Sequence, residues 1–312
     1  MKGAGAPDLD RAFVRLAGQG DLGALLDLAK LSGSGMTNLP ADAATLADKI
    51  AWSERSAAAV ITKPDDEYYL LVLDNGHGHA IGTASLFSRL GAKWPFYSYR
   101  QTRVTHVSRD LGRIFATQVL HLVNDYDGAS EVGGLFLHPN ARATGLGRLL
   151  ARSRYLFIAR HRERFGDRVV AELRGWIENG VSPFWEAIAR PFFGRPFSEA
   201  DRYNAIHGNQ FIIDLMPRYP IYVTMLPEAA QQAIGKPHRD SVPALRLLQS
   251  EGFANDGYCD IFDGGPTLCA RTDAIETVRR CRPEGAALVC RWNEALIAHG
   301  RAGEFRARLL RD

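Results

Sequence analysis

The chain has 312 residues, of which 46% are hydrophobic and 23% are charged, and its formal net charge at pH 7 is +3. This composition is typical of a soluble globular protein of one large or two ordinary domains, and it argues against a disordered or membrane-spanning chain. The 38 Lys and Arg residues are spread along the chain, which argues against a nucleic-acid surface. The N-terminus has no apolar run of signal-peptide length, so we expect a cytoplasmic protein.

The first 130 residues contain strand and helix signals in alternation. A short β-like run covers residues 13–17, Asp21 is suited to cap a helix that follows it, and a second helix is expected to begin at Asp42. Asp74-Asn75-Gly76 is a strong hairpin signal between two β-rich runs. Those runs cover residues 68–73 and 79–86, and they are followed by a strand over 102–108 and by a strand or helix over 114–123.

The stretch from Glu131 to Phe165 is the part of the chain around which the rest is arranged. Val132, Leu135 and Leu137 alternate as one face of a strand, and Gly133-Gly134 within it is a place where the backbone can bulge or be closely approached. After a loop over 138–144, apolar residues recur at helical spacing from about Gly145, so a helix is expected there.

The turn before this helix is glycine-rich and has the features of an anion site. The first N–H groups of a helix lack intrahelical partners, the helix dipole is positive there, and glycines allow close approach of a ligand. Arg142-Ala143-Thr144-Gly145-Leu146-Gly147 is neither a Walker loop nor a complete GxGxxG fingerprint. It resembles the pyrophosphate-binding turn of the GNAT acyl-coenzyme A transferases, with Arg148 one step inside the helix; the alternative is an ordinary strand–helix connection.

Two further elements complete this half of the chain. Residues 168–173 read as a buried strand, and Ser182 with Pro183 is expected to cap a helix over 182–193. The resulting order β-α-α-β-β-β-α-β-α is the one expected of the GNAT fold. We therefore predict an α+β protein with a central mixed, mostly antiparallel sheet flanked by helices.

Beyond about Arg202 the pattern changes to short strands and helices, which suits a second α/β lobe, with a second GNAT-like unit as one alternative. Strands are expected over 211–216, 221–225 and 258–262, and helices over 227–234 and 241–249. The Ala- and Arg-rich tail from Glu284 is expected to be helical or loosely attached. The predicted units are thus 10–202 for the acyl-CoA-binding domain, 203–283 for the second lobe and 284–312 for the tail.

Cysteines and histidines give no sign of a metal site. The four cysteines have no CxxC spacing and no histidines near them in sequence, so reduced structural thiols are favoured over zinc ligands or disulfides. His77 and His79 flank a hairpin glycine, where a surface turn is favoured over metal binding. The cysteines are Cys259, Cys269, Cys281 and Cys290.

Several longer runs resemble the arginine N-succinyltransferase family, AstA, in consistent order from about Phe13 to Val278. They are GMTNLP (35–40), FYSYR (96–100), EVGGLFLHP (131–139), AELRG (171–175), SPFW (182–185), FIIDLMPRYPIYV (211–223), AIGKPH (233–238), EGF (251–253) and DIFDGGPTL (260–268). Gly133-Gly134 departs from the Cys-Thr expected in the family, next to the acyl thioester, and the tail does not resemble the family's β-rich C-terminus.

The resemblance implies transfer of a succinyl group from succinyl-CoA to the α-amino group of L-arginine, in arginine breakdown. It also implies that no metal or permanently bound cofactor is needed and that the protein forms a homo-oligomer or a hetero-oligomer with a related chain. Two alternatives stay open. The acceptor could be ornithine or another amino acid, or the chain could be a non-catalytic subunit that binds coenzyme A.

Candidate site residues follow from the turn and the resemblance. A main-chain N–H near Leu135 or Leu137 is expected to bind the thioester carbonyl, and Leu135 matches the family's coenzyme-contacting leucine. His238 matches the family's proton donor, although a loop histidine is the plainer interpretation of that residue alone. The expected pyrophosphate-binding residues are Arg142, Gly145, Gly147 and Arg148.

The substrates would also need charged partners, because the succinyl group and the amino acid each carry a carboxylate and arginine carries a guanidinium. Structural ion pairs are an equal alternative for each candidate. Candidate carboxylate-binding residues are Arg100, Arg174 and Arg218, pocket walls are Ser182 and Trp185, and candidate guanidinium partners are Glu172, Asp214, Asp260 and Asp263.

Overall fold

A computed structural model describes residues 7–33, 36–142, 144–200, 203, 214–292 and 295–310. No helix in these ranges is long and apolar enough to cross a membrane. The first half contains, in chain order, the elements expected of it, including strands at the two segments expected between the third and sixth strands. They are β1 Phe13–Leu16, α1 Leu22–Ser32, α2 Ala43–Ala58, β2 Tyr68–Asp74, β3 Ala80–Phe87, β4 Ser98–Ser108, β5 Arg113–Val123, β6 Ser130–Leu137, α3 Leu146–Arg160 and β7 Arg168–Glu172.

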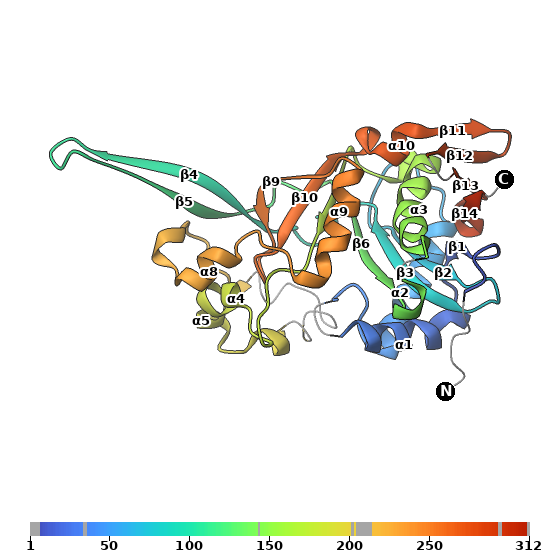
Figure 1. Ribbon diagram of the computed structural model, residues 1–312, viewed down its shortest axis with the longest axis horizontal. Helices are drawn as coiled ribbons and strands as arrows, with labels where there is room; N and C mark the ends of the chain where they lie inside the picture. Colours follow the sequence, from blue (N-terminus) through green and yellow to red (C-terminus); the bar gives the residue numbers. More distant parts are fainter. Residues whose placement is uncertain are drawn as a thin grey trace.

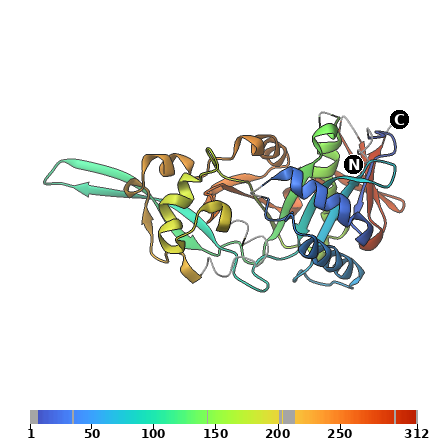
Figure 2. The ribbon, with the colours of Figure 1, turned by 90° about the horizontal axis from the view of Figure 1, so that it is seen from below.

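Helices cover both faces of the sheet in this half. Along β2, Tyr69 and Leu71 pack in the cluster that contains α3, whereas Tyr68 and Leu70 pack in the cluster that contains α1 and α2. Because successive strand residues point to opposite faces, α3 lies on one side of the sheet and α1 and α2 on the other. Figures 1 and 2 show this arrangement from two directions.

The segment over 114–123, for which strand and helix were both open, is the strand β5, and it pairs with β4 along its whole length. This hairpin projects from the body of the molecule as a long arm (Figure 1). It is attached near its base, where β4 pairs with a later strand at Tyr99 and Arg100.

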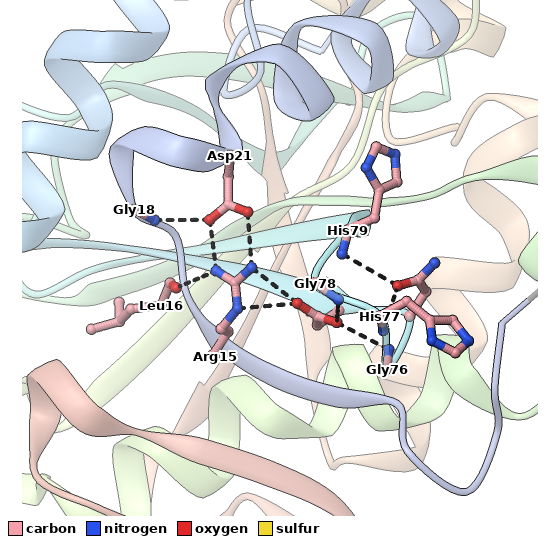
Figure 3. Close-up of polar contacts among 10 residues, drawn as sticks. Arg15, Leu16, Gly18, Asp21, Gly76, His77, Gly78 and His79 are labelled. Carbon is pink, nitrogen blue, oxygen red and sulfur yellow. Dashed lines mark hydrogen bonds and ion pairs between the residues drawn. The ribbon is translucent and has the colours of Figure 1, made fainter. Parts of the chain in front are cut away.

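Asp21 does not cap α1 through its side chain, contrary to expectation. Its carboxylate instead accepts hydrogen bonds from the Arg15 guanidinium at 2.6 and 2.9 Å and from the main-chain N–H of Gly18 at 2.9 Å. Arg15 also donates to Asp74 at the hairpin between β2 and β3, at 3.0 Å (Figure 3). One arginine thus links β1, the start of α1 and the hairpin turn.

Asp42, in contrast, caps α2 as expected, because its carboxylate accepts the N–H of Thr45 at 2.8 Å.

The helix expected over 182–193 is divided into two short helices at Ala189. Pro191 follows directly and has no N–H to continue a helical hydrogen-bond ladder. From residue 183 to the tail, which includes the lobe expected over 203–283, the described elements are short. They are α4 Pro183–Ile188, α5 Arg190–Phe193, β8 Ile221–Tyr222, α8 Glu228–Ala233, α9 Val242–Ser250, β9 Ala254–Cys259, β10 Pro266–Arg271 and α10 Glu276–Arg280.

Three strand predictions in this lobe need correction. Of the strand expected over 211–216, residues 211–213 lie outside the described part, and Asp214 and Leu215 are helical. The strand expected over 221–225 ends at Tyr222, and residues 223–225 form a 3-10 helix. The strand expected over 258–262 is displaced: it starts at Ala254 and ends at Cys259, where Asp260 begins a tight turn.

The tail is neither helical nor loosely attached. Together with residues 281–283 it forms four strands. Burial alternates along one of them, at Leu296 and Ala298, whereas Leu288, Val289 and Cys290 are buried in succession in another. The last strand pairs with β1, so the tail closes one end of the sheet. These strands are β11 Cys281–Glu284, β12 Ala287–Arg291, β13 Ala295–His299 and β14 Arg306–Leu310.

The described strands form one 14-stranded sheet that confirms the expected fold class. All its strand pairings are antiparallel except that of β6 with β7. The strand order is β11-β12-β13-β14-β1-β2-β3-β6-β7-β10-β9-β4-β5-β8.

Candidate active site

The candidate site lies where β6 and β7 diverge. These neighbours pair only at Ser130 with Val169 and at Glu131 with Val170. Beyond that point β6 stays paired with β3 as far as Leu137, and β7 stays paired with β10 through Glu172. The main-chain groups that face each other across the divergence therefore have no strand partner there, and a bound ligand can use them.

The β6 side of this divergence carries the expected bulge. Thr83 pairs with Phe136 and Ser85 with Gly133, so two residues of β6 stand opposite one residue of β3. Gly134 has a φ of 56°, in the left-handed region that favours glycine. A side chain at Gly133 would collide with Asn38, because a Cβ atom there would lie 2.5 Å from the Asn38 Nδ2 atom. The bulge thus changes the direction of the main chain immediately before Leu135.

The predicted anion-binding residues gather at the start of α3. Gly145 has a φ of 86° and precedes the helix, and Gly147 in the first turn lies against Leu137, with 3.7 Å from its ideal Cβ position to that side chain. Arg142 donates from Nε to the Leu137 carbonyl at 3.3 Å, which holds the turn against the end of β6. Arg142 and Arg148 are both exposed at this end of the helix, where added positive charge suits a phosphate.

Main-chain contacts hold His238 beside residues 174–175, just after the end of β7. Its N–H donates to the Arg174 carbonyl at 2.8 Å, and Pro237 forms a β-bridge with Gly175. The imidazole Nδ1 accepts the N–H of Asp240 at 3.2 Å, so the neutral ring carries its hydrogen on Nε2. Burial and the nearby Arg174 lower the pKa of His238, against the opposing effect of Asp240, and keep the ring neutral at pH 7.

Carboxyl groups from three strands or turns meet on the same face. Glu131 lies on β6, Glu172 on β7 and Asp260 at the turn after β9, and each feels the charge of the others. Burial raises the pKa of Glu131 to about 7, against the lowering effects of Asn38 and Lys49. Burial, then Asp260 and Glu131, raise the pKa of Glu172 well above its usual value.

The other predicted substrate residues lie elsewhere or have structural contacts. Arg100 is exposed on β4 and lies 3.5 Å from Asp125, and Arg218 is exposed in the loop before β8. Ser182 is buried and caps α4 by accepting the N–H of Trp185. Trp185 is fully buried and donates from Nε1 to the Arg195 carbonyl at 3.0 Å. Both side chains are thus packed inside the protein, and Trp185 belongs to a hydrophobic core that also contains Tyr99 and Cys259.

Asp263 and Asp214 also differ from what a guanidinium partner requires. Asp263 is buried, and its two carboxylate oxygens accept main-chain N–H groups of Gly175 at 2.7 Å and Gly265 at 2.9 Å. Asp214 is exposed. Within the described ranges, no group of three or more His, Cys, Asp or Glu residues is arranged to hold a metal ion.

Three residues near the divergence were missed by the sequence analysis. Glu131 is a charged residue at the start of an otherwise apolar strand, and this position alone could have identified it as a candidate functional residue. Asn38 belongs to the GMTNLP run, but its contact with Gly133 joins segments far apart in sequence. Lys49 lies on α2 with no local pattern that points to Glu131.

Several known proteins are similar to this chain. The chain matches the family model described as AstA, arginine N-succinyltransferase beta subunit, over residues 12–277. It is 38% identical over 302 residues to an arginine N-succinyltransferase of Enterobacter sp. (strain 638), covering 95% of this chain and 88% of that one. It is 40% identical over 267 residues to an arginine N-succinyltransferase subunit beta of Pseudomonas aeruginosa, covering 85% of this chain and 78% of that one.

A solved structure shows the same fold over nearly the whole chain. The arginine/ornithine succinyltransferase subunit AI of Pseudomonas aeruginosa superposes with a TM-score of 0.84 at 35% identity, covering 96% of this chain and 89% of that one. A match of this extent spans both lobes. The chain therefore belongs to the arginine N-succinyltransferase family of acyltransferases.

Proposed function

We propose that the protein transfers the succinyl group of succinyl-CoA to the α-amino group of L-arginine. The observation that carries this proposal is the meeting of three features at one place in the sheet. These features are the divergence of β6 and β7, the glycine-rich start of α3 beside Leu137, and His238 held at Arg174, just after the end of β7. The names of the relatives supply the identity of the acyl group and of the acceptor.

In this proposal the coenzyme lies along the divergence, with its pyrophosphate at the start of α3. Gly145 and Gly147 allow close approach there, and Arg142 and Arg148 add charge-assisted hydrogen bonds. A main-chain N–H at Leu135 or Leu137 donates to the thioester carbonyl and stabilises the oxyanion that develops on it.

The transfer is a direct attack in a ternary complex. The neutral amine attacks the thioester carbon, a C–N bond forms, the C–S bond breaks, and one proton leaves the nitrogen while the thiolate gains one. The neutral ring of His238 takes up the proton that the nitrogen loses, and the imidazolium so formed gives a proton to the leaving sulfur as proton donor. Arg174 and Glu172 lie on the same strand end and supply charges for the two substrates.

We infer that the chain works in the cytoplasm and assembles as a homo-oligomer or with a related chain, since two relatives are named as subunits. We also propose residues 10–202 as the acyl-CoA-binding unit and 203–283 as the lobe that completes the site, with 284–312 as a third segment.

The test is thiol release from succinyl-CoA by the purified protein with arginine, ornithine, lysine or no acceptor, and with acetyl-CoA as the alternative donor. We expect arginine-dependent release specific to succinyl-CoA, and a decrease of about 10²- to 10⁴-fold in kcat for His238→Ala. Preference for ornithine would change the acceptor but keep the chemistry, and the solved relative is named for both amino acids. Coenzyme binding without release with any acceptor would overturn the proposal and indicate a non-catalytic subunit.

A further inference from the structure

Glu172 and Asp260 are paired with each other without a cation. They share a hydrogen bond, Thr267 donates from Oγ1 to Glu172 at 3.2 Å, and Asp260 accepts the N–H groups of Phe262 at 2.6 Å and Asp263 at 2.9 Å. No Lys or Arg of the described residues forms an ion pair with Glu131, Glu172 or Asp260, although Lys49 lies near enough to Glu131 to lower the pKa of its carboxyl group. Such carboxyl groups are unfavourable in a dense interior unless a cation joins them.

Two buried hydroxyl groups at the Glu131 end of this cluster make no well-formed hydrogen bond. The side chains of Tyr68 and Ser85 are fully buried and their hydroxyls lie near each other, but neither hydroxyl has a hydrogen bond of acceptable geometry in the described ranges. The Tyr68 hydroxyl lies close enough to Glu131 to feel its charge. The Ser85 Oγ atom is 2.6 Å from the ideal Cβ position of Gly134, so it faces the bulge. Buried hydroxyls without a well-formed hydrogen bond are rare, and a ligand can satisfy them.

The cluster therefore has two ends that match the two cationic groups of an arginine molecule. The Glu131 end adjoins the bulge, where the reacting nitrogen must be, and the pair of Glu172 and Asp260 lies further along β7. A metal ion does not fit, because the described residues include no metal-like grouping of three ligands. A guanidinium does fit, since its planar set of five N–H donors matches two adjacent carboxylates.

We propose that Glu172 and Asp260 bind the guanidinium of the acyl acceptor, and that Glu131 with the Tyr68 and Ser85 hydroxyls faces its α-ammonium group. This assignment rests on the proposed function, and it makes the carboxyl pair the determinant of selectivity for a guanidinium side chain. An acceptor with a neutral side chain of the same shape would leave the pair without a cation.

The test compares arginine with citrulline, in which an uncharged urea group replaces the guanidinium. Binding of each to the full-length protein is measured by calorimetry in the presence of coenzyme A, for the native chain and for Glu172→Gln. Glu172 is chosen because Asp260 also holds a turn. Glu163→Gln, at an exposed glutamate, is the matched control, and Glu172→Asp tests whether a shorter carboxylate restores selectivity.

We expect the native protein to bind arginine at least tenfold more tightly than citrulline. Glu172→Gln should weaken arginine binding by roughly 10- to 100-fold and leave citrulline binding within about twofold, while Glu163→Gln changes neither. Equal losses for both ligands, or no loss, would overturn the proposal. If Glu172→Gln does not fold, the native comparison alone decides, because equal affinities for arginine and citrulline exclude a guanidinium subsite.

Failure of this inference can be told apart from failure of the proposed function. A protein that transfers succinyl groups to arginine but shows no charge selectivity through Glu172 would refute only the subsite. A protein that neither binds arginine nor releases thiol would refute the proposed function itself.

Discussion

Replacement of Gly134 by alanine tests whether the bulge in β6 is built on glycine. Its φ of 56° is left-handed, which costs a residue with a side chain about 1–2 kcal/mol. An added Cβ would also lie 2.6 Å from the Ser85 Oγ atom, and overpacking of a buried site costs about 1–3 kcal/mol. The two effects together predict that Gly134→Ala lowers the free energy of unfolding by about 2–5 kcal/mol.

The two contributions can be separated because only one of them involves Ser85. In the double variant Gly134→Ala with Ser85→Ala the collision is removed, so a loss of about 1–2 kcal/mol from backbone strain should remain relative to Ser85→Ala alone. Urea unfolding measures both losses, and the KM for succinyl-CoA should rise because the Leu135 N–H is displaced. A single variant as stable as the native protein, with an unchanged KM, would refute the role assigned to the bulge.

Three further predictions concern other parts of the site and scaffold. Arg15→Met leaves Asp21 and Asp74 buried without their cation and should lower the free energy of unfolding, measured by urea unfolding, by roughly 3–5 kcal/mol. A loss of stability as small as that from removing an exposed ion pair would contradict this prediction. Burial acts to raise the pKa of Asp21, but the hydrogen bonds from Arg15 and Gly18 outweigh burial and lower this pKa. The stability that the ionised Asp21 contributes is therefore present above pH 3.8 and is lost as the pH falls through the lowered pKa. Gly145→Ala should raise the KM for succinyl-CoA but not for arginine, whereas Gly180→Ala, also at a left-handed glycine, should change neither constant. Because the pKa of Glu131 is raised to about 7 and only its ionised form attracts a cation, the KM for arginine should fall roughly tenfold between pH 6 and pH 8, and Glu131→Gln should flatten this dependence.

The sequence predicted the features that depend only on residues near one another in the chain. The hairpin at Asp74-Asn75-Gly76, the Asp42 cap and the bulge at Gly133-Gly134 each depend on residues within a few positions of one another. The sequence of the β4–β5 arm has no clear hydrophobic period. Much of the arm is exposed on both faces, so apolar and polar residues do not alternate along it.

The tail was predicted wrongly for a different reason. Its strands are about five residues long, and their Ala and Arg content resembles that of a helix. What makes them strands is pairing: β11, β12, β13 and β14 pair in succession, and β14 also pairs with β1 about 290 residues earlier in the chain. Propensity alone does not contain this pairing, so it favoured the wrong state.

The site could be predicted only where its parts are local. The spacing of its glycines identifies the glycine-rich turn in the sequence. His238 could be identified only from the family resemblance, because its contact with Arg174 spans 64 residues of chain. The carboxyl cluster had no local signature at all. Glu131, Glu172 and Asp260 come from segments that only the sheet brings together.

The order of strands explains why these distant residues meet. β7 pairs with β6 over two residue pairs only, but with β10 over five, so the second lobe is joined to the sheet on the far side of the divergence. The turn with Asp260 and the Pro237 bridge to Gly175 are both anchored to that side of β7. The glycine-rich turn at the start of α3 belongs to the β6 side. In the proposed function the β6 side would bind the coenzyme, while Glu172, Asp260 and His238 come from the β7 side, so the transfer would need both sides of the gap.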